Sequence, residues 1–317
     1  MWAHLGCFAF KPVIAIPVRV VLNFSIGKIA RLSTRFKEDL LNPLLEPLFS
    51  KWRRGNIAMF HIGRSGSTVL GNLLDQDTNI RWDGELCPDI FQALDCTEER
   101  RLALHELKPL LGRTTDLLDR IRHGQRRAGT RFYGVELKFF HLYAFDLGLS
   151  ECIERLSGLG FDHFIILERR NYLRKIVSSV VAKETGMYHV KHGCKSKLNR
   201  ISLNVEQVSV DRQTMPLLEF LVSYQECFRQ LEQLLKNRKY LKLTYEEDIL
   251  VNPKVAYGKV CSFLGIEGNP VEVNLSKTNP YPLSDVIENF DDVSKHLEET
   301  SFNGCFTMIE FESIDAC

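Results

Sequence analysis

Short apolar runs alternate along this chain with stretches whose apolar residues have helical spacing. The apolar runs have the length of buried strands and cover residues 57–62, 132–140, 164–167 and 240–244. Helical spacing covers residues 68–74, 173–181 and 217–235. Asn252 marks the start of a last helix, and Gly265 marks its end.

This alternation predicts an α/β fold, in which a parallel central sheet is flanked by helices. We expect one main domain over residues 51–317, preceded by a helical extension over residues 1–50. Residues 97–129 are charged and helical in pattern, whereas residues 183–215 have little periodicity. Because ligands of such sheets bind at the carboxyl ends of the strands, we interpret these two regions as a partly helical lid over the site.

Composition narrows the classes of protein. The chain has 317 residues, 44% of them hydrophobic and 26% charged, which is ordinary for a globular protein. A net charge of +1 gives no general attraction for nucleic acid, so we expect no nucleic-acid partner. The nine cysteines are scattered singly without a CxxC pair, which argues against a disulfide scaffold or structural zinc and favours a reducing, cytoplasmic location.

The apolar stretch near the amino terminus allows two interpretations. Residues 12–26 are shorter than a membrane span and contain Pro17 and Arg19. No Lys or Arg precedes Lys11, so the stretch is a poor signal peptide. We favour a helix packed on the domain, and membrane-surface contact through residues 12–36 is the less favoured alternative.

The turn after the first apolar run has the composition of a phosphate-binding loop. It reads Gly63-Arg64-Ser65-Gly66-Ser67-Thr68 and leads directly into a predicted helix. Backbone N–H groups at a helix start converge on one point, and the helix dipole favours an anion there. The three hydroxyls add donors and Arg64 adds a fixed charge, so a P-loop-type site is predicted.

The loop differs from that of nucleoside triphosphatases. It lacks the lysine of the GxxxxGK[ST] pattern, and the third predicted strand leads into Glu168-Arg169-Arg170 rather than an evident magnesium-binding acid. A magnesium-dependent triphosphatase is therefore disfavoured. A P-loop kinase-like phosphotransferase and a catalytically silent nucleotide-binding module remain alternatives.

A second anion site is predicted after the third strand. Arg170 stands at the strand end, and Ser178 follows eight residues later, about two turns into the next helix. Arg170 offers a bidentate fork and Ser178 a hydroxyl, which together suit a second phosphate. In the competing interpretation, Arg170 forms an interfacial salt bridge and Ser178 is an unrelated surface serine.

Taken together, these segments resemble the family of PAPS-dependent sulfotransferases. Residues 60–68 look like that family's 5′-phosphosulfate loop, and Arg170 through Ser178 looks like its 3′-phosphate motif. Residues 243–248, 263–266 and 277–290 resemble later family segments, the last of them those of bacterial members. Arg64, where many cytosolic members carry Lys, brings the chain closer to the bacterial and carbohydrate branches. The resemblance covers about residues 55–302 and implies a sulfotransferase domain that uses PAPS as donor and needs no metal.

The resemblance also implies catalytic candidates. Glu85 follows the loop helix and matches the place where bacterial members carry a catalytic glutamate. His141 is predicted at the end of the second strand and is similar to the histidine of the cytosolic Lys-x-His element, with one extra residue between it and Lys138. We rank Glu85 first as general base and His141 second, with Lys138 contacting the transferred group. The acceptor is expected to be a small molecule, lipid or glycan with a hydroxyl or amine.

Two histidines near residue 190 have a spacing that occurs in metal sites. His189 and His192 have His-x-x-His spacing, but no carboxylate completes a convincing set of ligands. We interpret both as loop residues and predict no metal site.

Overall fold

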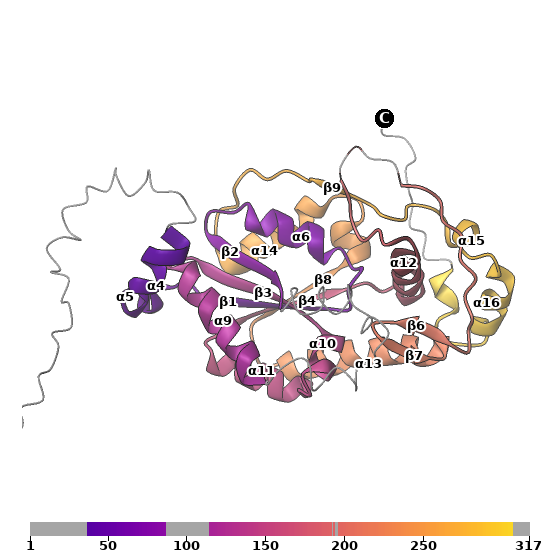
Figure 1. The fold of residues 1–317 in the computed structure, drawn as a ribbon, viewed down its shortest axis with the longest axis horizontal. Coiled ribbons are helices and arrows are strands. Elements are labelled where there is room, and N and C mark those ends of the chain that lie inside the picture. The colour runs from indigo at the N-terminus through magenta and orange to yellow at the C-terminus, as the bar shows by residue number, and fades with distance from the viewer. Residues whose placement is uncertain (1–36, 87–113, 192, 194–195, 307–317) are drawn as a thin grey trace, which may run out of the picture.

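The computed structural model describes residues 37–86, 114–191, 193 and 196–306 (Figure 1). The predictions for residues 1–36, for residues 97–113 and for His192 lie outside these ranges. Within them the predicted α/β fold is confirmed, with a parallel central sheet covered by helices on both faces.

The central sheet has five parallel strands in the order β2-β3-β1-β4-β8. The strands are β1 (Asn56–His61), β2 (Ile80–Glu85), β3 (Phe132–Lys138), β4 (His163–Glu168) and β8 (Tyr240–Thr244). Strand β1 lies in the middle, and the chain builds first one side of the sheet and then the other. The carboxyl end of β1 is therefore a switch point of the topology, where α/β proteins bind their ligands.

Two helices cover one face of the sheet. Helix α6 (Ser67–Asp75) and helix α14 (Pro253–Leu264) pack together over the buried residues of one hydrophobic cluster. That cluster takes Ile57 and Met59 from β1 and Leu243 from β8. Figure 1 shows both helices on the same side of the strands.

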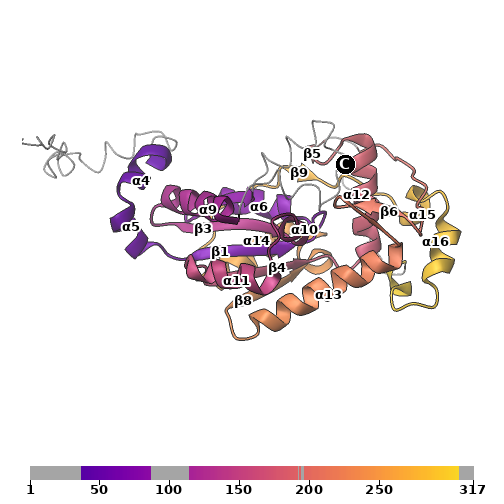
Figure 2. The same ribbon diagram turned by 60° about the horizontal axis from the view of Figure 1, so that its bottom comes forward.

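The opposite face carries a larger hydrophobic cluster that takes Ala58 and Phe60 from β1. Its helices are α9 (Thr114–Ala128), α10 (Phe139–Ala144), α11 (Leu149–Gly158), α12 (Tyr172–Thr185) and α13 (Leu217–Leu235). Helix α13 runs along this face, as Figure 2 shows from a second direction. Its buried residues form one stripe.

Local sequence signals fix several boundaries. The Asn171 side chain caps α12 by accepting a hydrogen bond from the Arg174 N–H at 2.9 Å. Asn252 caps α14 in the same way, at 3.1 Å from the Lys254 nitrogen. Gly265 then ends α14 in a left-handed conformation, so this predicted helix is confirmed at both ends.

Shorter elements complete the described chain. They are η1 (Lys37–Leu41), α4 (Asn42–Leu44), α5 (Glu46–Trp52), β5 (Val190–Lys191), β6 (Val208–Val210), β7 (Gln213–Met215), η3 (Tyr245–Ile249), β9 (Leu275–Ser276), α15 (Leu283–Val286), α16 (Phe290–Leu297) and η4 (Asn303–Cys305). Strands β6 and β7 form an antiparallel hairpin, and β5 pairs with β9.

The structure differs from the sequence-based expectations at two strands. The apolar run 132–140 is too long for its strand: β3 ends at Lys138 and α10 begins at Phe139, so His141 lies in a helix rather than at a strand end. Strand β2 was not predicted, because Ile80 and Trp82 are its only apolar residues. The region 183–215 carries short strands in its described part after α12 ends, and Ile201, Val208 and Val210 are buried in the core. Its interpretation as part of a lid stays a prediction.

Gly134 offers a test of the packing in this sheet. A Cβ at Gly134 would lie 2.2 Å from the Trp82 ring, so we expect Gly134→Ala to lower the free energy of unfolding by about 1–3 kcal/mol. Gly258 in α14 is the matched control, since a Cβ there meets nothing within 4 Å. Gly258→Ala should raise stability by about 0.5–1 kcal/mol in urea unfolding. Equal effects at the two positions would contradict this account.

Candidate active site

The phosphate-loop candidate lies at the carboxyl end of β1. Gly63, Arg64 and Gly66 all have left-handed backbone conformations, with φ of 76°, 51° and 81°. Such a succession curls the chain so that N–H groups point toward a common centre. A Cβ at Gly66 would lie 2.5 Å from Ile249 Cγ2, so η3 packs directly against the loop and requires a glycine there.

Two features of this loop suit an anion. No side chain caps the start of α6. The first N–H groups of the helix are therefore available to bind an anion. Ser65 is fully buried, and its Oγ makes no hydrogen bond to any described residue. A buried hydroxyl without a partner is costly, and a phosphate or sulfate oxygen in the loop would satisfy it.

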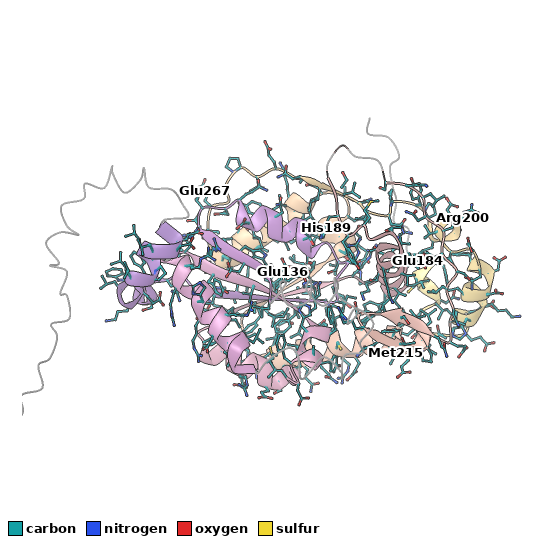
Figure 3. The ribbon with its side chains drawn as sticks, in the orientation of Figure 1. Glu136, Glu184, His189, Arg200, Met215 and Glu267 are labelled. Atoms are coloured by element: carbon teal, nitrogen blue, oxygen red, sulfur yellow. The ribbon has the colours of Figure 1, made fainter. Side chains whose placement is uncertain are left out.

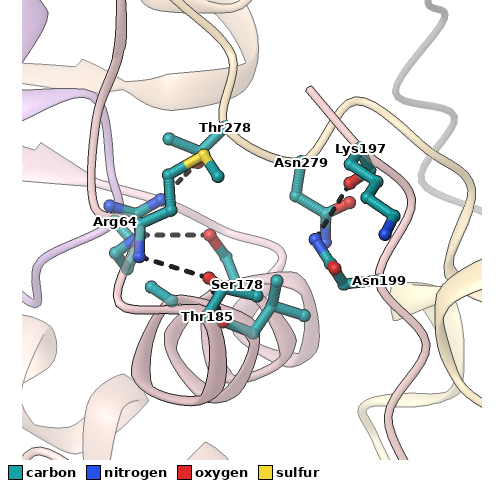
Figure 4. Close-up of a pocket in the computed structure, with 10 residues that line it drawn as sticks. Arg64, Ser178, Thr185, Lys197, Asn199, Thr278 and Asn279 are labelled. Carbon is teal, nitrogen blue, oxygen red and sulfur yellow. Dashed lines mark hydrogen bonds between the residues drawn. The ribbon is translucent and has the colours of Figure 1, made fainter. Parts of the chain in front are cut away.

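Arg64 links the loop to two distant segments (Figure 4). Its Nε donates to Ser178 Oγ at 3.0 Å, and its terminal nitrogens donate to the Tyr188 carbonyl at 2.8 Å and to the Thr278 hydroxyl. These contacts bring together the two serine- and arginine-bearing segments that the sequence analysis singled out separately. Arg64, Ser178 and Thr278 line a small pocket of about 10 Å³, which is enough for roughly one water molecule.

The Arg64 guanidinium sits in an unfavourable electrostatic setting. Burial and the nearby charge of Arg169 lower the pKa of Arg64 to about 10. Arg169 is itself buried, donates to the Arg64 carbonyl at 2.8 Å and stacks 4.2 Å from the centre of the Tyr245 ring. Two cations held this close together favour an anionic ligand between or beside them.

Glu85 and Lys138 form an ion pair at the same edge of the sheet. Glu85 ends β2 after a bulge in the pairing with β3, and its Oε1 lies 2.6 Å from Lys138 Nζ. The Lys138 chain also contacts the loop, because a Cβ built on Gly63 would lie 3.6 Å from Lys138 Cε. Both side chains are partly exposed, with Glu85 at 33% and Lys138 at 18%.

His141 is near this pair in sequence but is enclosed. It is 3% exposed, and its ring packs edge-on at 4.3 Å against Phe140. Burial, with Lys138 and His61 nearby, lowers the pKa of His141 well below its usual value. The imidazole is therefore neutral at neutral pH, and its access to a substrate is poorer than that of Glu85.

Arg170 does not join Arg64 and Ser178 in their pocket. Its guanidinium lies 2.8 Å from Glu247 Oε1 and 3.8 Å from Glu246 Oε2 in η3, and its side chain is 43% exposed. Glu246 also accepts the N–H groups of Arg170 and Asn171 at 3.1 and 3.0 Å. The sequence pair Arg170–Ser178 is thus divided in this state, with Ser178 beside Arg64 instead.

Two contributors were missed by the sequence analysis. Thr278 reaches Arg64 because β9 pairs with β5, a contact between segments far apart in the chain that no local pattern reveals. Lys175 is fully buried, with its Nζ on Asp211 and 2.7 Å from the Tyr224 hydroxyl. Lys175 connects the β6–β7 turn to α12 and α13. Its place directly before the apolar pair Ile176 and Val177 was the sequence feature that could have indicated its burial.

Comparison of the sequence with models of known protein families and with curated proteins gives no match. Among solved structures, a sulfotransferase from Alicyclobacillus acidocaldarius aligns with 81% of this chain and 94% of its own, at 13% identity and a TM-score of 0.43. What the observations above define is an α/β fold with a P-loop-type turn at its switch point.

No group of three or more His, Cys, Asp or Glu side chains in the described part of the chain is arranged to hold a metal ion. No helix within it is long and apolar enough to cross a bilayer.

The buried pair of Lys175 and Asp211 provides a stability test. Burial lowers the pKa of Lys175, and the charge of Asp211 opposes that change. We expect Asp211→Asn to leave an uncompensated buried charge and to lower the free energy of unfolding by about 3–5 kcal/mol. Because the unfolded chain holds the Lys175 proton more tightly, this residue's contribution should make stability rise as pH approaches 10.5 from below.

Asp119 supplies the control for this measurement. It forms an exposed pair with Arg122 at 2.7 Å, so Asp119→Asn should change stability by less than about 0.5 kcal/mol. Similar small losses in both variants would show that the Lys175 charge does not depend on Asp211.

Proposed function

We propose that this chain is a PAPS-dependent sulfotransferase that moves a sulfuryl group to a hydroxyl or amine of a small-molecule, lipid or glycan acceptor. The observation that carries the proposal is the loop of residues 63–68, with its left-handed backbone, uncapped helix start and unpartnered Ser65 hydroxyl. A loop of this kind would hold the 5′ end of the donor.

The loop residues would act by stabilising charge. Sulfuryl transfer parallels phosphoryl transfer, in which an in-line displacement is aided mainly by positioning and electrostatics. Negative charge develops on the bridging oxygen as the nucleotide leaves. The N–H groups at the start of α6, the hydroxyls of Ser67 and Thr68, and Arg64 are the donors available to stabilise it.

The 3′ end of the donor is assigned to Ser178 and Arg170. Ser178 lies beside the loop, since its Oγ accepts from Arg64 Nε at 3.0 Å, and this direct hydrogen bond would have to open for a donor phosphate to reach Ser178. For Arg170 to join them, its guanidinium would leave Glu247, an exposed pair that costs little to open.

Glu85 is the preferred general base. Its carboxylate is solvent-accessible and paired with Lys138 beside the loop, so it can reach a proton on an entering acceptor. Lys138 would in turn contact the transferred group. His141 is the second choice, because it is enclosed in α10 and its neutral ring would have to be exposed first.

The alternatives remain a P-loop kinase-like phosphotransferase and a silent nucleotide-binding module. A kinase-like site needs an acid free to bind magnesium after a strand. Glu168 at the end of β4 instead accepts from the Tyr172 hydroxyl and pairs with Lys242 at 2.9 Å. The engagement of Glu168 by these two residues favours the sulfotransferase hypothesis over the kinase-like one.

Donor binding tests the assignment of the anion sites. We expect the wild-type chain to bind PAP in calorimetry, and Arg64→Gln and Arg170→Ala each to weaken binding about 10- to 100-fold, since each loses a charge-assisted hydrogen bond. Arg229→Gln, on the exposed side of α13, is the control and should bind as wild type does. Unchanged affinity in Arg170→Ala would refute the second anion site, and absence of wild-type binding would refute the proposal itself.

Turnover tests the base. With PAPS and a panel of phenols, sugars and amines, Glu85→Gln should lower kcat about 10²- to 10⁴-fold while PAP affinity is retained. His141→Asn should have the smaller effect. A chain that binds PAP but never releases it from PAPS, with both variants behaving like wild type, would be a silent binding module.

A further inference from the structure

His61 is the last residue of β1 and lies immediately before the loop. It is fully buried, and its Nδ1 accepts a hydrogen bond from the Gly63 N–H at 3.0 Å. Gly63 is the first of the left-handed residues in the turn. The imidazole therefore holds the backbone at the point where the strand becomes the loop.

This hydrogen bond defines how the ring is protonated. Because Nδ1 accepts, it carries no proton, and the proton of the neutral ring is on Nε2. Nε2 points to Glu136 on β3, whose Oε2 is 3.4 Å away, within ion-pair range but long for a hydrogen bond. One edge of the ring thus faces the loop and the other faces a carboxylate.

Glu136 is held in turn by Trp82 of β2. The indole Nε1 donates to Glu136 Oε1 at 2.8 Å, and Figure 3 places Glu136 over the middle of the sheet. Burial opposes ionisation of Glu136, but its contacts with His61 and Trp82 outweigh burial, so the pKa of this carboxyl is lowered. A chain of polar contacts therefore crosses three strands, from β2 through β3 to the loop.

Helix α6 closes over this chain of contacts. A Cβ at Gly71 would lie 2.5 Å from Glu136 Oε1 and 2.7 Å from Trp82 Nε1, so the helix backbone packs directly on these atoms. The three side chains are 0%, 4% and 6% exposed for His61, Glu136 and Trp82. Such enclosed polar groups tolerate little displacement, which makes the arrangement rigid.

We infer that His61 is a positioning residue of the loop, which fixes Gly63 in its left-handed conformation so that the following N–H groups face the anion. Glu136 and Trp82 orient the ring that does this. For the identity of the anion the inference rests on the proposed function, but the effect on the loop itself does not. A purely structural role would require only that the polar groups of His61 be buried and satisfied.

Two substitutions separate these roles. In His61→Asn, the side-chain oxygen can accept from the N–H two residues on, which retains the Gly63 contact and gives up Glu136. In His61→Gln, the longer amide reaches toward Glu136 and gives up the Gly63 contact. Selective ¹⁵N-glycine labelling then allows hydrogen exchange of the Gly63 amide to be measured directly, alongside PAP affinity by calorimetry and thermal stability.

We expect Gly63 to be protected from exchange in the wild-type chain and in His61→Asn, and to exchange about tenfold faster in His61→Gln, as for loss of one hydrogen bond. PAP affinity should fall about tenfold in His61→Gln and stay within about threefold in His61→Asn. Equal exchange and equal affinity in the two variants, whatever their stabilities, would overturn the inference.

The wild-type measurement decides the matter even if a variant does not fold. A Gly63 amide that exchanges as fast as exposed Gly193 would overturn the inference without any substitution. If the wild-type chain does not bind PAP but Gly63 behaves as expected in all three proteins, His61 positions the loop and only the proposed function fails.

Discussion

Several cations lie around one turn of backbone in this molecule, and burial together with their mutual repulsion makes Arg64 and Lys175 costly to keep charged. Arg64 and Arg169 adjoin each other at the loop, and the charges of Arg64 and Lys138 both act on buried Lys175. Each cation is partly compensated: Lys138 by Glu85, Lys175 by Asp211, and Arg64 by neutral oxygens alone. Unlike Lys138 and Lys175, Arg64 is therefore held without a carboxylate partner among the described residues.

The neighbouring elements place an acid beside several of these cations. Glu85 follows the bulge of β2 and pairs with Lys138, and Asp211 lies in a left-handed conformation in the β6–β7 turn beside Lys175. Even η3 contributes by pairing Glu246 and Glu247 with Arg170. Glu85, Asp211, Glu246 and Glu247 are thus each paired with a particular cation near the loop.

Local patterns in the sequence placed strands β1, β3, β4 and β8 and helices α6, α12, α13 and α14, but not β2, α10 or α11. The range of α13 was predicted as Leu217–Leu235, because a long single-faced stripe has few alternatives. Strand β2 was missed because edge strands need few apolar residues, and Glu85 was consequently predicted after a helix rather than on a strand. The contacts within the site could not be predicted in this way. Arg64, Ser178 and Thr278 come into contact only through the order of the strands and the β5–β9 pairing. Residue spacing along the chain also gives no sign that Arg170 pairs with Glu247 rather than lying beside Ser178.

The contact between Arg64 and Thr278 joins residues 214 positions apart in the sequence. A chain leaving the ribosome makes the phosphate loop early and must wait for nearly all of the remaining domain before that arginine has its last partner. Until then Arg64 lacks one of the three oxygen partners that hold its guanidinium in the finished fold.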